Sequence, residues 1–275
     1  MFVTRFAPSP TGDLHRGHAF SALMAFEAAR AAGGRFILRI EDIDATRCRP
    51  EFEAGIYEDL TWLGLSWETP VRRQSEHLDD YHAALSRLET EGVLYRCFRT
   101  RKEVAEAMAS APHGAMEVFT GRPLAIADEM ARLAAGEPFA WRLSLAAAAR
   151  KLGGFGALTF NDEIEGIIQA RPELGGDVVL ARKDVGVAYH LAVTVDDALQ
   201  GVTQVIRGQD LFEATHVQRL LQALLGLPTP TYRHHTLLVG PDGKRFAKRD
   251  RSETLRSLRE RGMSGADLRR ELGFD

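Results

Sequence analysis

The chain has 275 residues, of which 45% are hydrophobic and 27% charged, and its formal net charge is -3 at pH 7. This length suits one large domain or a domain with a sizeable insertion, and the charge excludes nucleic-acid binding through overall positive charge, which leaves only a local basic face. The two cysteines, Cys48 and Cys97, exclude a disulfide framework and cannot alone supply the four ligands of a structural zinc site.

The N-terminal sequence MFVTRFAPSP lacks the basic-then-apolar layout of a signal peptide. No uninterrupted apolar stretch approaches the length of a membrane-spanning helix. Together with the low cysteine content, these features predict a cytoplasmic protein in a reducing compartment.

The first part of the chain has the pattern of a β-loop-α-β unit. Residues 2–6 favour a strand, 17–32 a helix ended by two glycines, 35–40 a second strand and 50–63 a second helix. Such a unit binds a nucleotide at the carboxyl ends of its parallel strands.

Beyond a helix expected at 74–90, the segment 94–176 changes character and is interpreted as an insertion between two halves of the parallel sheet. The elements expected in it are helices at 102–109 and 124–135 and strands at 139–143 and 156–160. The parallel sheet is expected to resume with strands at 177–181, 204–207 and 236–239, with helices at 188–199 and 211–225 and two short helices before the terminus.

Two histidines, His15 and His18, lie at the predicted N-terminus of the first helix, after the turn sequence Pro-Ser-Pro-Thr-Gly. This position would place imidazole donors beside unpaired backbone N–H groups and the positive end of the helix dipole, which suits a polyphosphate. Gly17 removes a side chain where an adenine ring could lie on the backbone. In isolation the motif is equally consistent with two surface histidines, but its place between a strand and a helix favours a nucleotide site.

Five charged residues within nine positions follow the strand at 35–40: Arg39, Glu41, Asp42, Asp44 and Arg47. One interpretation is a solvated loop with local ion pairs. The alternative is a ligand site, because Glu41 lies at the carboxyl end of a strand and its carboxylate can accept hydrogen bonds from a substrate ammonium group.

A basic run near the C-terminus contains Lys244, Arg245, Lys248, Arg249 and Arg251. It is either an ordinary solvated charge run or a mobile loop that closes over the β- and γ-phosphates of a nucleotide.

Four blocks together resemble the class I aminoacyl-tRNA synthetases of the glutamyl and glutaminyl branch. Residues 5–18 resemble the HIGH-motif region, 38–47 (LRIEDIDATR) the second block of that branch, 207–211 (RGQDL) a third, and 244–249 (KRFAKR) stand in the place of the KMSKS loop. The blocks lie in the family's order across nearly the whole chain.

This resemblance implies an α/β fold in which a Rossmann-type parallel sheet forms a nucleotide-binding catalytic domain. It also implies an inserted mixed α+β acceptor-binding subdomain and a short C-terminal helical segment, without an anticodon-binding domain. The predicted divisions are 1–93 and 177–240 for the two halves of the catalytic domain, 94–176 for the insertion and 241–275 for the KMSKS-like loop and helical C-terminus.

The resemblance further implies that the chain binds glutamate. The glutamate-binding residues carried over from the family are Arg5, Ala7, Ser9, Glu41, Tyr189 and Arg207. Glu41 would contact the α-amino group, Tyr189 would help select the side chain, and the arginines would pair with carboxylates. Because two arginines leave a glutamine amide badly paired, glutamate is favoured over glutamine.

The implied reaction is adenylation, in which the glutamate carboxylate attacks ATP while Mg2+ helps to neutralise the phosphates. The implied catalytic residues are His15, His18 and Lys248. The implied ATP-binding residues are Pro10, Gly12, His15, Gly17, His18, Asp210, Leu211, Arg245 and Lys248. The loop departs from the family at Arg245, in place of the usual first lysine, and at Ala247, in place of the usual serine.

The chain ends 26 residues after Arg249, where a glutamyl-tRNA synthetase would continue into an anticodon-binding region. This favours the shorter paralogues of the family, which activate glutamate without tRNA and attach it to the queuosine base at the wobble position of tRNA(Asp). The expected partner is therefore the anticodon stem-loop of queuosine-containing tRNA(Asp), and the expected state is a monomer. The alternatives are a truncated enzyme that charges tRNA(Glu) and a non-catalytic paralogue that binds glutamate or RNA.

Many of these paralogues bind zinc in the insertion through a Cys-x-Cys pair and a later Tyr and Cys. Here the pair reads Cys97-Phe98-Arg99, and no cysteine follows. We expect no metal site, an insertion held by apolar packing, buried or half-buried thiols at Cys97 and Cys48, and a surface position for His113.

Overall fold

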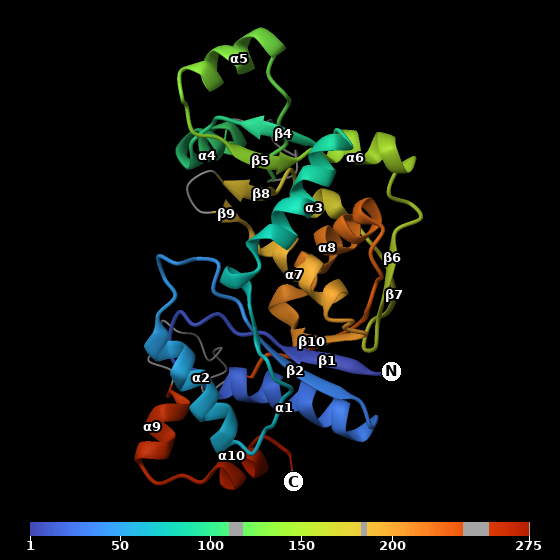
Figure 1. Cartoon of the computed structure of the whole chain (residues 1–275). Helices are drawn as coiled ribbons and strands as arrows, with labels where there is room; N and C mark the ends of the chain where they lie inside the picture. Colours follow the sequence, from blue (N-terminus) through green and yellow to red (C-terminus); the bar gives the residue numbers. More distant parts are fainter. Residues whose placement is uncertain (110–117, 183–185, 239–252, 275) are drawn as a thin grey trace.

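The computed structural model describes residues 1–109, 118–182, 186–238 and 253–274 (Figure 1). Its first elements are β1 (Val3–Phe6), α1 (Arg16–Ala31), β2 (Arg35–Ile40) and α2 (Pro50–Trp62). The strands β1 and β2 are parallel, and the short strand β3 (Arg72–Arg73) is parallel to β2. The predicted β-loop-α-β unit and second helix are confirmed.

A second pair of parallel strands lies beside β1. These strands are β10 (Gln204–Gly208) and β11 (Thr231–His235). The backbone N–H of Thr203 donates to the carbonyl of Val3 at 2.9 Å, which joins the start of β10 to β1. The carboxyl ends of β1, β2 and β10 meet at one cavity, as expected for a parallel sheet of this class.

Helices cover both faces of these strands (Figure 1). Ile37 and Val205 belong to a core that includes α3 (Leu78–Thr90), α7 (Tyr189–Leu199) and α8 (Phe212–Leu225). Their sequence neighbours Leu38 and Ile206 belong to a second core that includes α1 and α2. This alternation is expected of a strand buried on both sides, and the predicted α/β class is confirmed.

Four strands between Leu94 and Val187 form a separate antiparallel sheet in the upper part of Figure 1. Its strands are β4 (Leu94–Cys97), β5 (Ala140–Leu143), β8 (Val179–Arg182) and β9 (Gly186–Val187). Its helices are α4 (Arg101–Ala109), α5 (Ile126–Ala134) and α6 (Leu145–Leu152), of which α6 was not predicted. Short 3-10 helices lie at Gln74–Glu76, Pro172–Gly175 and Gln209–Leu211.

Three strand predictions are corrected by the sheet topology. The strand expected at 177–181 does not resume the parallel sheet, because β8 pairs antiparallel with β5. The strand expected at 156–160 is β6 (Thr159–Asp162), which forms a hairpin with β7 (Gly166–Gln169) and pairs with β11. The strand expected at 236–239 lies earlier, as β11. Local alternation identifies a strand but not its partner, which long-range packing decides. The division of the chain into four segments stays a prediction.

The two predicted C-terminal helices are confirmed as α9 (Leu255–Glu260) and α10 (Gly265–Glu271), which pack on the core beside α2. A Cβ atom at Gly265 would collide with the carbonyl oxygen of Trp62, so glycine permits this close approach. None of the helices in the described ranges is long and apolar enough to cross a membrane.

Arginine-aromatic stacking and one buried carboxylate, and not apolar packing alone, hold together the part of the chain around this antiparallel sheet. The guanidinium of Arg142 lies 4.4 Å from the ring centre of Phe119. Asp177, which is 3% exposed, accepts hydrogen bonds from the Tyr95 hydroxyl at 2.9 Å and from the backbone N–H groups of Gly121 and Leu145 at 2.8 and 3.0 Å. The carboxylate thus joins β4, the loop at Gly121 and the start of α6.

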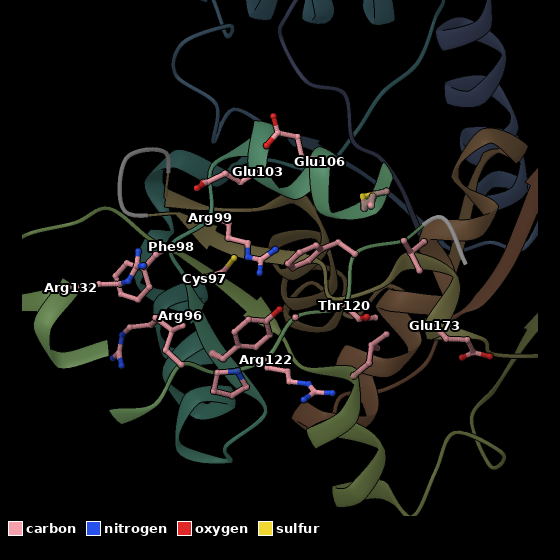
Figure 2. A pocket seen from close by; sticks show the side chains of 18 residues that line it. Arg96, Cys97, Phe98, Arg99, Glu103, Glu106, Thr120, Arg122, Arg132 and Glu173 are labelled. Atoms are coloured by element: carbon pink, nitrogen blue, oxygen red, sulfur yellow. The ribbon is translucent and has the colours of Figure 1, made fainter. Parts of the chain in front are cut away.

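A cavity of about 1060 Å3 lies in this segment, and Figure 2 shows Cys97 and Arg99 at it. Cys97 is a buried free thiol and Cys48 a half-buried one, as predicted. Among the described residues, no three His, Cys, Asp or Glu side chains are grouped as metal ligands. His113 lies outside the described residues.

Replacing Asp177 by alanine is expected to lower the free energy of unfolding by about 3 kcal/mol, because three donors, two of them buried, lose their acceptor. Tyr95→Phe, which removes one of the three bonds, should cost about 1 kcal/mol. Urea unfolding measures both, with Asp128→Ala on the exposed surface of α5 as the control. A urea midpoint for Asp177→Ala equal to that of the wild type would show that these hydrogen bonds do not stabilise the fold.

Candidate active site

The cavity at the carboxyl ends of β1, β2 and β10 has a volume of about 660 Å3. It brings together most of the predicted site residues: Arg5, Ala7, Ser9, His15, Gly17, His18, Glu41, Tyr189, Arg207, Asp210 and Leu211. Pro10 and Gly12 lie in the loop between β1 and α1 and do not line the cavity. Arg245, Ala247 and Lys248 lie outside the described residues.

His15 and His18 cap the N-terminus of α1. The Nδ1 atom of His15 accepts a hydrogen bond from the backbone N–H of Gly17 at 3.1 Å, and Nδ1 of His18 accepts one from the N–H of His15 at 3.2 Å. The predicted arrangement of imidazoles beside unpaired backbone N–H groups is therefore modified, because the N–H of Gly17 is paired with the imidazole of His15. Since each Nδ1 atom is an acceptor, the proton of each neutral ring is on Nε2.

Gly17 also serves the histidine pair directly. The two rings stack with their centres 3.8 Å apart. A Cβ atom at Gly17 would lie 3.0 Å from Cε1 of His15, so a side chain there would push the capping imidazole by a few tenths of an ångström. Glycine therefore leaves the cap undisturbed.

Of the described residues that flank 239–252, Leu238 lies at this cavity and Thr254 contacts the loop before α1. Leu238 is part of its lining. Thr254 forms an isolated antiparallel bridge with His15, and the backbone N–H of Leu255 donates to the carbonyl of Leu14 at 2.8 Å. The start of α9 is therefore attached to the loop that carries the histidines.

One buried ion-pair network holds Arg5 and Glu41. The carboxylate of Asp197 in α7 accepts from Arg5 Nε at 3.1 Å and from Arg39 Nη1 at 2.8 Å. Arg39, which is completely buried, also donates through Nη2 to Glu41 Oε1 at 3.3 Å. No contact within the described residues engages the Nη groups of Arg5, so both remain for a carboxylate in the cavity.

The protonation equilibria in this network differ from group to group. Burial alone would raise the pKa of Asp197, but Arg5 and Arg39 outweigh it and hold that pKa below its ordinary value. At Glu41, burial outweighs the attraction of Arg39 and Arg5, and the pKa is raised. The neighbouring arginines therefore do not fully compensate the negative charge of Glu41, and a substrate ammonium group would add the missing positive charge.

Asp196, which is fully buried, joins this network to α3. It accepts from Arg72 Nε at 2.7 Å, from Gln74 Nε2 at 2.7 Å and from the Tyr81 hydroxyl at 2.9 Å. Because its oxygens are satisfied by these donors, Asp196 anchors α7 and thereby the position of Asp197.

Arg207 on β10 is held differently, by uncharged partners. Its Nε donates to His234 Nε2 at 3.1 Å, and its Nη2 donates to Thr215 Oγ1 at 2.7 Å and to Gln218 Oε1 at 2.8 Å. Its Nη1 lies 3.3 Å from the Tyr189 hydroxyl. Within the described part of the chain Nη1 has this one partner, so a second N–H of Nη1 can donate to a substrate.

His234 in turn contacts a carboxylate from β6. Its Nδ1 atom lies 2.7 Å from Asp162 Oδ2, and both residues are nearly inaccessible to solvent. Burial and the charge of Arg207 lower the pKa of His234 to about 4. Burial would raise the pKa of Asp162, but hydrogen bonds from His234 and from the backbone N–H groups of Ile164 and Glu165 lower it.

His234 makes the stability of the protein depend on pH. The unfolded chain takes up this proton near pH 6.5, whereas the folded protein takes it up only near pH 4. The part of the free energy of unfolding that depends on a neutral His234 is therefore fully present above pH 6.5. It decreases as the pH falls towards 4, and the loss at pH 5 is about 2 kcal/mol. Urea unfolding at pH 7.5 and 5.0 should show a smaller loss in His234→Gln than in the wild type. His82→Gln, at an exposed histidine, should keep the wild-type dependence.

The sequence analysis missed the residues that orient the predicted ones. These are Asp162, Asp197, Thr215, Gln218 and His234. One available signal was the pair Asp196-Asp197 inside the apolar helix 189–199, where two adjacent acids need buried partners. The others become visible only through contacts between distant segments.

Comparison with known proteins agrees with this site. Residues 1–272 match the family described as "tRNA synthetases class I (E and Q), catalytic domain". Glutamyl-Q tRNA(Asp) synthetase of Rhodobacter capsulatus is 47% identical over 99% of this chain and 100% of that protein. The protein of the same name from Symbiobacterium thermophilum is 44% identical over 96% of this chain and 83% of that protein.

Among solved structures, glutamate-tRNA synthetase from Elizabethkingia anophelis superposes with a TM-score of 0.76 at 28% identity. The match covers 95% of this chain and 54% of that one. The resemblance inferred from the four sequence blocks is confirmed, and the chain belongs to the catalytic-domain family of the class I (E and Q) tRNA synthetases.

Proposed function

We propose that this ligase activates glutamate with ATP, without tRNA, and transfers the glutamyl group to the queuosine base at the wobble position of tRNA(Asp). The observation that carries the proposal is one cavity that gathers two buried arginines, a carboxylate whose side chain is 9% exposed and two helix-capping histidines. The 47% sequence identity over the full length of a glutamyl-Q tRNA(Asp) synthetase supports the choice of acceptor. The tRNA substrate assigns the reaction to the cytoplasm.

Glutamate binds with its ammonium group at Glu41 and its carboxylates at Arg5 and Arg207. The Nη groups of Arg5 offer two donors to one carboxylate, and Arg207 offers Nη1 beside the Tyr189 hydroxyl. A glutamine amide would turn its own N–H groups towards these donors, which leaves buried groups unpaired and disfavours glutamine. Ala7 and Ser9 line the same cavity.

ATP binds with its phosphates at His15 and His18, whose Nε2–H groups donate, and with its adenosine end along Gly17, Asp210 and Leu211. Pro10 and Gly12 shape the loop before α1. Mg2+, Arg245 and Lys248 supply positive charge to the phosphates. A glutamate carboxylate oxygen forms the bond to the α-phosphorus, and the bond to the pyrophosphate oxygen breaks.

A glutamyl-tRNA synthetase activity is the second candidate, because the solved structure of that name shares this fold over 54% of its own length. Transfer of labelled glutamate to tRNA(Asp) with and without queuosine, and to tRNA(Glu), separates the two. We expect label only on queuosine-containing tRNA(Asp). Label on tRNA(Glu) as an alkali-labile 3'-terminal ester would overturn the assignment. Absence of glutamate-dependent ATP-pyrophosphate exchange, with and without RNA, would instead favour a non-catalytic binding protein.

The same enzyme is proposed to act as a monomer without zinc. The position of the second family cysteine is Arg99, and Arg99 lies 6.0 Å from the ring centre of Phe119. We expect the purified protein to contain less than stoichiometric zinc and to unfold at the same temperature with and without EDTA. Light scattering gives the oligomeric state, and one zinc per chain would contradict the metal-free assignment.

A further inference from the structure

The guanidinium of Arg207 is oriented by its neighbours before any substrate binds. A guanidinium has five N–H groups, and four of those of Arg207 point at protein acceptors: His234, Thr215, Gln218 and Tyr189. Of these contacts, the one to His234 is made at Nε, the atom nearest the aliphatic stem, and therefore fixes the rotation of the whole group.

This contact requires one particular tautomer of His234. The Nε–H of Arg207 can only donate, so His234 Nε2 must present a lone pair. The proton of the neutral ring is then on Nδ1, where Asp162 Oδ2 accepts it at 2.7 Å. In the opposite tautomer two N–H groups would face each other across 3.1 Å, and Nδ1 would point its lone pair at a carboxylate.

Asp162 is itself fixed in direction. Its Oδ1 accepts from the backbone N–H groups of Ile164 and Glu165 at 2.9 and 3.1 Å, within the β6–β7 turn. Its Oδ2 accepts from both the backbone N–H and Nδ1 of His234. The carboxylate therefore has no rotational freedom, and it also fixes the backbone that carries the imidazole.

We propose that Asp162 and His234 are positioning residues for the glutamate site: Asp162 selects the Nδ1–H tautomer of His234, and His234 then turns the Nη1 end of Arg207 into the cavity. This rests on the proposed function, in which Arg207 binds a glutamate carboxylate. Because Asp162 comes from β6, a strand of the segment 94–176, that segment contributes directly to amino-acid binding.

Two substitutions at His234 separate positioning from packing. His234→Leu removes the acceptor, and we expect the KM for glutamate in ATP-pyrophosphate exchange to rise by about 10- to 100-fold, with the KM for ATP unchanged. His234→Gln can place an amide oxygen near the Nε2 position and should recover about tenfold of that loss.

Asp162→Asn tests the choice of tautomer. Its amide oxygen can keep the turn hydrogen bonds, which leaves an N–H2 group facing His234 and favours the opposite tautomer. We expect a rise in the KM for glutamate similar to that of His234→Leu. In an Arg207→Leu background, Asp162→Asn should raise the KM no further, because the group that it positions is gone.

The matched control is His216, a second buried histidine in the same aromatic cluster. The ring centres of His216 and His234 lie 5.6 and 5.1 Å from that of Phe212. However, His216 accepts a hydrogen bond from the backbone N–H of Arg171 and not from Arg207. His216→Leu should therefore leave the KM for glutamate unchanged even if it lowers stability. Equal effects of the two leucine variants on this KM would reduce His234 to a packing residue.

A measurement without substrate tests the tautomer directly. The imidazole 15N spectrum of the wild type should show a proton on Nδ1 and none on Nε2 of His234 at pH 7, and Asp162→Asn should reverse the two. A wild-type proton on Nε2 would overturn the proposal whatever the enzyme does. Absence of exchange in the wild type would refute the proposed function. An unchanged KM for glutamate in Arg207→Leu would refute the role of Arg207. In both cases the spectrum still reports whether Asp162 selects the tautomer of His234.

Discussion

Replacing Arg39 by methionine is expected to lower the free energy of unfolding by about 3–5 kcal/mol. Arg39 is completely buried and lies among the carboxylates of Asp197, Glu41 and Asp196, which together raise its pKa above the ordinary value although burial opposes its charge. Methionine fills a similar space but leaves three acids in an interior that has lost the cation between them.

The pH dependence of this loss distinguishes unpaired charge from a packing defect. In Arg39→Met the buried carboxyl groups can become neutral by protonation, so the deficit relative to the wild type should shrink as the pH falls from 7 to 4.5. Urea unfolding at both pH values measures it. Arg35→Met is the control, because Arg35 pairs with Glu68 on the exposed surface, and its midpoint should stay close to that of the wild type. A pH-independent deficit would point to lost packing.

Arg5→Lys is expected to raise the KM for glutamate by about 100-fold and to leave the KM for ATP near its wild-type value. Lysine keeps the positive charge near Asp197, so the fold retains its ion pair. It cannot, however, bind Asp197 through one nitrogen and present two further nitrogens to a substrate carboxylate. The loss should therefore fall on glutamate binding.

Arg72→Lys is the matched control for this change. Arg72 belongs to the same network through Asp196 but does not line the cavity, so the substitution should leave the KM for glutamate unchanged. ATP-pyrophosphate exchange with varied glutamate measures both variants. Equal shifts in the two would mean that the network as a whole, and not the Nη groups of Arg5, sets the affinity.

The sequence predicted the first strands and helices because their burial follows simple periods. The helix at 17–32 is rich in apolar residues and ended by two glycines, and the strand 35–40 follows that turn as a short apolar run, so local patterns suffice. The strand β11 was not predicted at its actual position because its sequence is Thr-Tyr-Arg-His-His, in which two buried histidines resemble surface residues. Their burial depends on partners elsewhere in the chain, which no local pattern contains.

The site divides in the same way. Arg5, Glu41 and Arg207 stand at strand ends within motifs, so their cavity could be predicted. Asp197 lies 192 residues from Arg5 along the chain, and Asp162 lies 72 residues from His234. Such pairs are brought together only by sheet order and helix packing, and the sheet order was the part predicted least well.

The pairing of β6 with β11 has a consequence for how the protein could be shortened or how its ancestors could have acquired the segment 94–176. A cut at the borders suggested by the sequence would remove Asp162 and leave His234 without its acceptor. Gain or loss of that segment as a cassette would therefore need a compensating change on β10 or β11. In evolutionary terms, the segment 94–176 and the proposed glutamate site are linked through Asp162 and His234 and are not separately exchangeable.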